Sequence, residues 1–202
     1  GLASAGLIIG ITFDLVSTFD KMYMRTGDAG WLVGDVLSTL LGGFLATKVL
    51  TPLLGGEAAK IALPITLAVS AIASVVALIG EKDVSALSKE SIVMSILSGL
   101  KMGAGVGGLF YLGGYTPGQA VGVGVGAALA WFGASIGIKA TANVFDTGEI
   151  TSETISADLI AALSVGGGLA IMEAAVGGTA ATIAGVGVGG VLLTFGALIA
   201  IQ

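Results

Sequence analysis

Long apolar stretches alternate with short clusters of charge along the 202 residues. Residues 61–80, 102–138 and 174–202 each contain no charged side chain. About 20 helical residues, rising about 1.5 Å each, cross a hydrocarbon core of roughly 30 Å. The pattern therefore predicts membrane-spanning helices. Seven apolar segments result, at about 1–19, 33–54, 61–80, 91–113, 118–138, 155–174 and 179–202.

The segments form an internal repeat. The string SKESI at 88–92 is echoed by TSETI at 151–155, and each string opens an apolar segment. Ser88 and Thr151 are predicted N-caps, each followed by a glutamate in the first turn. One unit contains an apolar helix, a charged loop, a glycine-rich apolar helix and a double-glycine turn. We predict an all-α, polytopic transmembrane helix bundle of about six or seven glycine-rich helices. It comprises three helix-pair repeats at 1–60, 61–118 and 119–178 and a final helix at 179–202, together one membrane domain.

Composition agrees with a lipid environment. Hydrophobic residues make up 55% of the chain and charged residues only 10%, whereas soluble chains contain about 25% charged residues. The chain contains no cysteine and no histidine. Its net charge is −5, and its basic residues do not cluster into a surface that would bind nucleic acid. We therefore predict no enzyme activity, no metal site and no cofactor. Since the sequence begins with glycine and not methionine, we expect a piece of a longer polypeptide.

The 35 glycines lie within apolar runs. Glycine in a membrane helix lets two backbones approach closely, and spacings of four residues place glycines on one face. The strings at 103–108 and 185–190 also match a dinucleotide-binding pattern, but neither follows a strand or precedes the required acid. Helix packing is the preferred interpretation. The predicted packing glycines are Gly99, Gly103, Gly107, Gly122, Gly126, Gly185 and Gly189.

Two charged residues lie inside apolar stretches, and such residues are functional candidates. Lys101 is a candidate for facing a water-filled path, and Glu173 for pairing with it or binding a cation. Alternatively, Lys101 extends to the interface from near a helix end and Glu173 caps the following glycine turn. The acids Asp28, Asp35, Asp146, Glu149 and Asp158 are candidates for binding a hard cation through their oxygens, but they lack EF-hand spacing and are interpreted as solvated loop acids. Trp131 is grouped with the aromatic residues that line the membrane interface.

The segments resemble the hydrophobic regions of tape measure proteins from long-tailed bacteriophages. The strings GIKATANVFDTGEI at 137–150 and DLIAALSVGGG at 158–168 carry the resemblance, which covers nearly the whole chain without a diagnostic motif. It implies a segment that leaves the virion tail, inserts into the host inner membrane and helps genome ejection by forming a channel. The implied partners are the lipid bilayer, other copies of the chain or other membrane subunits, and DNA that passes without sequence-specific binding.

Two other functions fit the same residues. One is a stand-alone polytopic membrane subunit, such as a channel, a transporter part or an assembly component. The other is a pore-forming toxin or a holin-like protein that inserts from a soluble state.

Overall fold

The computed structural model describes residues 84–202, which belong to one compact unit, Leu78–Gln202. This part of the chain forms four helices and no strand. They coincide with the last four predicted segments, and the segments at 1–19, 33–54 and 61–80 lie outside the described residues. The helices are α3 (Lys89–Leu112), α4 (Pro117–Thr147), α5 (Ser152–Ala175) and α6 (Ala180–Ile201).

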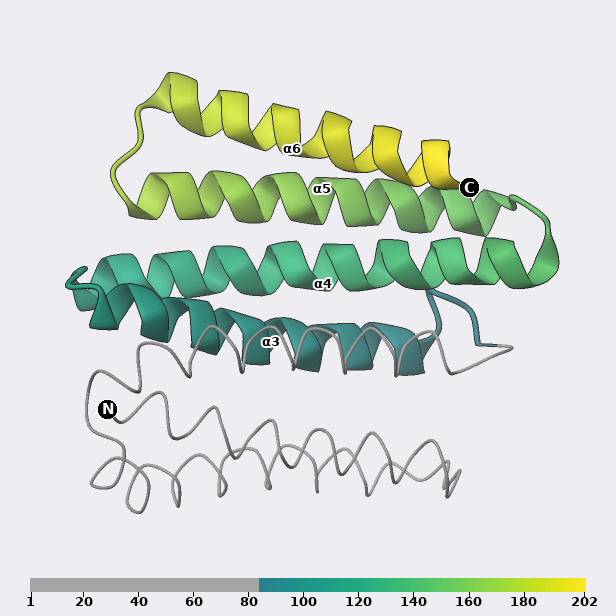
Figure 1. The fold of residues 1–202 in the computed structure, drawn as a ribbon, viewed down its shortest axis with the longest axis horizontal. Helices are drawn as coiled ribbons and strands as arrows, with labels where there is room; N and C mark the ends of the chain where they lie inside the picture. The colour runs from purple at the N-terminus through teal and green to yellow at the C-terminus, as the bar shows by residue number, and fades with distance from the viewer. Residues whose placement is uncertain (1–83) are drawn as a thin grey trace, which may run out of the picture. The chain divides into compact units, whose positions relative to one another are not determined.

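The four helices lie side by side in chain order, and each runs antiparallel to the next (Figure 1). Each packs chiefly against its neighbour in the sequence, and α4 makes a minor additional contact with α6. The α3–α4 and α5–α6 loops consequently share one end of the bundle. The α4–α5 loop and the start of α3 share the other end (Figure 1).

Every described helix begins at a hydroxyl side chain. The side chain of Ser88 accepts a hydrogen bond from a backbone N–H in the first turn of α3, and Thr116, Thr151 and Thr179 do the same for α4, α5 and α6. This bond satisfies one of the N–H groups left without a partner at a helix start. The predicted N-caps at Ser88 and Thr151 are confirmed.

Each of the three loops has four residues and contains a glycine with positive φ. These glycines are Gly114 (φ 93°), Gly148 (φ 72°) and Gly177 (φ 93°). Side chains clash with the backbone in this left-handed conformation, so glycine is favoured there. At Gly148 the same geometry ends α4, because the backbone N–H donates to the carbonyl of Val144. The glycines thus allow tight reversals between long helices.

The helix α4 is longer than the sequence pattern predicts. The apolar segment was expected to end near residue 138, but the helix continues through Lys139 to Thr147. Lys139 is buried in the bundle, so this charge does not mark a helix end. The extra turns carry Asn143 and Asp146 to the end of the bundle where the α4–α5 loop lies.

All four described helices are long and apolar enough to cross a membrane, judged by length and composition. They contain 22 to 31 residues each. The helix α6 has the most apolar surface, with Leu193 77% exposed and Leu192 68% exposed. Within α6, Gly190 is the one buried residue. A helix with this much exposed aliphatic surface is stable in lipid and costly in water.

Replacing Gly148 with alanine tests the reversal between α4 and α5. We expect Gly148→Ala to reduce the free energy of unfolding by about 1–2 kcal/mol, because alanine is strained at positive φ. Unfolding by SDS, followed by circular dichroism in mixed micelles, measures the change. Gly118→Ala is the matched control, since nothing lies within 4 Å of the added Cβ at this helical position. Equal stability of the two variants would contradict the role assigned to Gly148.

Candidate functional site

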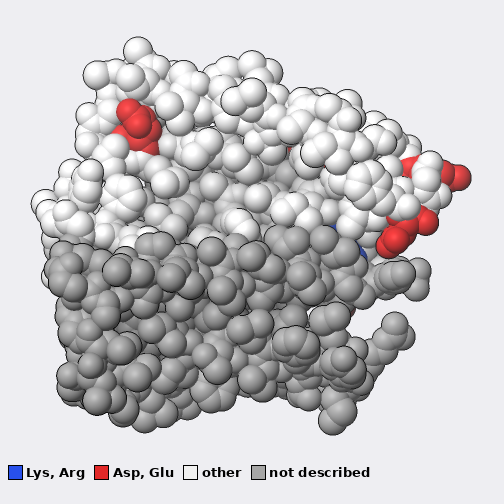
Figure 2. Space-filling view, in the orientation of Figure 1, with Lys and Arg blue, Asp and Glu red and all other residues white. Residues whose placement is uncertain are grey.

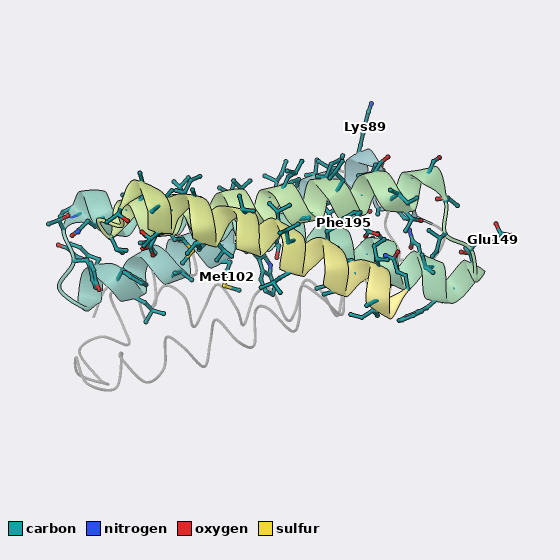
Figure 3. The ribbon with its side chains drawn as sticks, turned by 90° about the horizontal axis from the view of Figure 1, so that it is seen from above. Lys89, Met102, Glu149 and Phe195 are labelled. Carbon is teal, nitrogen blue, oxygen red and sulfur yellow. The ribbon has the colours of Figure 1, made fainter. Side chains whose placement is uncertain are left out.

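Charged side chains gather at the ends of the described helices. Figure 2 shows acidic residues at both ends of the described part of the chain and few charged side chains on the face of that part between them. Lys89 and Glu149 both lie toward the end that carries the α4–α5 loop, and Lys89 projects sideways from the bundle (Figure 3). Glu173 lies near the opposite end, close to the last residue of α5. Within residues 84–202, this leaves the long flanks of the helices as apolar surface.

Of the two predicted intramembrane charges, Lys101 is half-buried in the middle of α3, far from either end of that helix. Its position does not fit the alternative in which a lysine near a helix end extends to the interface. Glu173 lies against Gly178 in the α5–α6 loop, because a Cβ added to Gly178 would meet the Glu173 carboxylate at 2.5 Å. Glu173 therefore lies beside the glycine turn, on a different helix from Lys101.

The glycines of α3 lie directly against α4. A Cβ added to Gly99 would lie 2.5 Å from the carbonyl oxygen of Ala128, and one added to Gly107 would lie 2.8 Å from that of Ala120. Gly103 lies between them and faces the backbone of Gly124. A Cβ added to Gly124 would in turn lie 2.8 Å from the carbonyl oxygen of Gly103. The two backbones therefore meet along three successive turns.

A second glycine face of α4 contacts α5. A Cβ on Gly122 would lie 2.7 Å from the Cβ of Ala175, and one on Gly126 would lie 2.5 Å from the carbonyl oxygen of Gly168. The same is true of Gly133, which faces the carbonyl oxygen of Ala161 at 2.6 Å. Sequence spacing marked the first two positions but did not show that α4 uses opposite faces for its two neighbours.

The predicted glycines of α6 lie elsewhere. A Cβ added to Gly185 or Gly189 would have open space around it, whereas the α5–α6 contact uses Gly166 and Gly190. A Cβ on Gly166 would lie 2.5 Å from the carbonyl oxygen of Gly187 on α6. The spacing of Gly185 and Gly189 is therefore not used for packing within the described helices.

Trp131 also differs from the prediction. It lies near the middle of α4, and its indole Nε1 donates a hydrogen bond of 2.7 Å to the Ser98 hydroxyl of α3. Interfacial aromatic residues lie near helix ends. The Trp131 indole lies away from those ends and links α3 to α4. Tyr111 and Tyr115 are exposed beside the α3–α4 loop, as expected for interfacial aromatic residues.

Neither of the two most deeply buried charged groups is among the intramembrane charges predicted from the sequence, although Asp158 is among the candidate cation ligands. Lys139 on α4 is 1% exposed, and Asp158 on α5 is 0% exposed. The interpretation of Asp158 as a solvated loop acid is therefore wrong, because α5 begins at Ser152 and places it more than one turn into the helix. The available signal was its position inside a segment already predicted to be helical.

Asp158 belongs to a polar cluster that joins three helices. The Gln202 amide Nε2 donates hydrogen bonds to Asp158 Oδ1 at 3.1 Å and to the Thr141 hydroxyl at 3.3 Å. Asp158 Oδ2 and Gln202 Oε1 are also buried, and neither has a hydrogen-bond partner. We call Thr141, Asp158 and Gln202 the three-helix polar cluster.

A separate polar pocket lies beside the α4–α5 loop. It has a volume of about 250 Å³, and its lining includes Asn143, Asp146 and Glu153. The segment before α3 closes one side, since Asn143 Nδ2 donates to the carbonyl of Val84 and the Ser85 hydroxyl donates to Glu153. Among residues 84–202, no three His, Cys, Asp or Glu side chains are grouped to hold a metal ion.

Comparisons of the chain with protein families, with curated proteins and with solved structures each give no match.

Adding a methyl group to Gly103 tests the α3–α4 contact. We expect Gly103→Ala to lower the free energy of unfolding by about 1–3 kcal/mol, because the new Cβ would meet the Gly124 backbone and lie 2.7 Å from the Cβ of Ala128. SDS unfolding in micelles, followed by tryptophan fluorescence, measures this loss. Gly189→Ala makes the same change in open space and should leave the stability nearly unchanged. A Gly103→Ala variant as stable as its control would show that the close approach is unimportant.

Proposed function

We propose that the chain is a membrane-inserting helical domain whose helices enter the bilayer as antiparallel hairpins. The observation that carries the proposal is the combination of four span-length apolar helices with two uncharged loops at one end. Residues 113–116 and 176–179 contain no charged side chain. Moving the α3–α4 loop across a bilayer avoids the desolvation of an ion, which is a large cost of translocation, whereas the α5–α6 loop carries one ionisable group with it, Glu173.

The opposite end of the described bundle has a different chemical character. The α4–α5 loop contains Glu149, and Asp146 and Glu153 lie within a few residues of it. Lys89 and Glu90 begin α3 at the same end. Ionised side chains there resist transfer through hydrocarbon. This asymmetry supports insertion with the α3–α4 and α5–α6 loops leading and the charged end remaining on the side of entry.

The biological role we propose follows the tape measure resemblance. A segment of this kind would leave the phage tail, insert into the host inner membrane and help the genome to cross it. The described helix flanks are apolar, so a hydrated path for DNA requires other surfaces, which several copies of the chain or other membrane subunits would provide. DNA would then pass without recognition of its sequence.

Site-selective labelling tests the proposed hairpin insertion. The chain has no native cysteine, so Tyr115→Cys, Glu149→Cys and Val176→Cys each introduce one thiol in a different loop. The full chain, diluted from detergent into preformed vesicles, is then exposed to a membrane-impermeant maleimide. We expect outside labelling of the Glu149→Cys variant and protection of the other two variants, because their loops cross the bilayer.

Lysis of the vesicles with detergent is the control and should make all three thiols reactive. Outside labelling of all three variants would indicate a chain lying on the surface and would reject hairpin insertion. Failure to enter preformed vesicles, with correct insertion during synthesis, would favour the stand-alone membrane subunit.

The mass of the native polypeptide tests the phage role separately. We expect a chain several times longer than 202 residues with a long helical remainder, as the tape measure resemblance requires. A native mass equal to that of these residues would reject that role while leaving hairpin insertion intact.

A further inference from the structure

The three-helix polar cluster contains an acid with unusual surroundings. Asp158 has no exposed surface, and its hydrogen-bond partner is the side chain of Gln202, just beyond the last residue of α6. Thr141 contributes a hydroxyl from α4 to the same amide group. The Gln202 amide therefore joins a buried carboxylate of α5 to a hydroxyl of α4.

The hydrogen bonds of this cluster leave two acceptors without donors. The Gln202 amide directs its N–H groups to Asp158 Oδ1 and Thr141, while its own Oε1 has no partner. Asp158 Oδ2 also has none, so no donor reaches it, including the Lys139 ammonium two residues before Thr141. Two buried oxygens without donors are costly, and a bound cation or a proton beside them would offset that cost.

We propose that Thr141, Asp158 and Gln202 bind a small monovalent cation, with Na⁺ as the probe. Carboxylate, amide carbonyl and hydroxyl oxygens are hard ligands of the kind that such cations prefer. One carboxylate balances one positive charge, and the residues hydrogen-bonded in the cluster supply no second carboxylate. The bound cation links the ends of α4, α5 and α6.

The test uses the complete chain in lipid nanodiscs and ²³Na NMR line widths. Sodium is titrated at constant ionic strength against choline, a bulky quaternary ammonium ion that oxygen ligands do not coordinate as they do Na⁺. We expect Na⁺-dependent line broadening for the unchanged chain. Asp158→Asn and Gln202→Met should weaken apparent Na⁺ affinity at least about tenfold, equivalent to about 1.4 kcal/mol. Each removes an oxygen ligand or its charge while nearly conserving side-chain size.

Asp146→Asn is the matched control, because it makes the same substitution at an exposed position of α4. It should retain the Na⁺-dependent broadening. Thr141→Val keeps the carboxylate and should weaken binding less than Asp158→Asn does. Circular dichroism confirms that each variant keeps its helices, so a loss of binding is distinguished from a loss of fold.

Two results would overturn the proposal. One is equal broadening for the unchanged chain and for a folded Asp158→Asn variant, which would place any bound sodium elsewhere. The other is a melting temperature that changes with pH and not with Na⁺, which would assign the positive charge at Asp158 to a proton. Hairpin insertion does not require the cation, so the labelling experiment remains an independent test.

Discussion

Contact between bare backbone surfaces is the constraint on which the described bundle depends. In lipid, apolar side chains gain little by leaving their surroundings, so helices associate through close packing and hydrogen bonds. Gly103 and Gly124 meet with no room for a Cβ on either residue, and Gly126 and Gly168 meet in the same way between α4 and α5. With a glycine face toward each neighbour, α4 is the helix around which the other contacts are arranged.

Polar groups inside the bundle add specificity to this packing. The Trp131–Ser98 hydrogen bond fixes α3 against α4, and the amide of Gln202 connects Asp158 with Thr141 near the end of α6. Such bonds are partly buried and depend on the relative position of the helices. Packing through glycine brings the helices together. The hydrogen bonds favour one rotation of each helix about its axis and one position along its neighbour. The charged residues at the bundle ends have solvent available and place no comparable demand on helix position.

The sequence predicts where the described helices lie along the chain better than it predicts which of their residues pack against other helices. Ser88 and Thr151 mark helix starts because a hydroxyl and a following glutamate are local signals. The end of α4 and the burial of Asp158 were missed because a charge was taken to mark an interface, although neighbouring helices can bury it. Glycine spacing identified Gly103 but also Gly185, which is open, because a helix apolar on all sides has no periodic signal showing which face packs.

The four-residue loops have a consequence for how the chain reaches its structure. Since each loop joins helices that pack together, almost every contact among the four described helices is made between consecutive stretches of the chain. This is a low contact order, which favours rapid folding and small entropic losses on closing each loop. A helix emerging during synthesis finds its main partner in the helix made just before it. The helices α3 to α6 can therefore pack against one another progressively, in the order in which they are made.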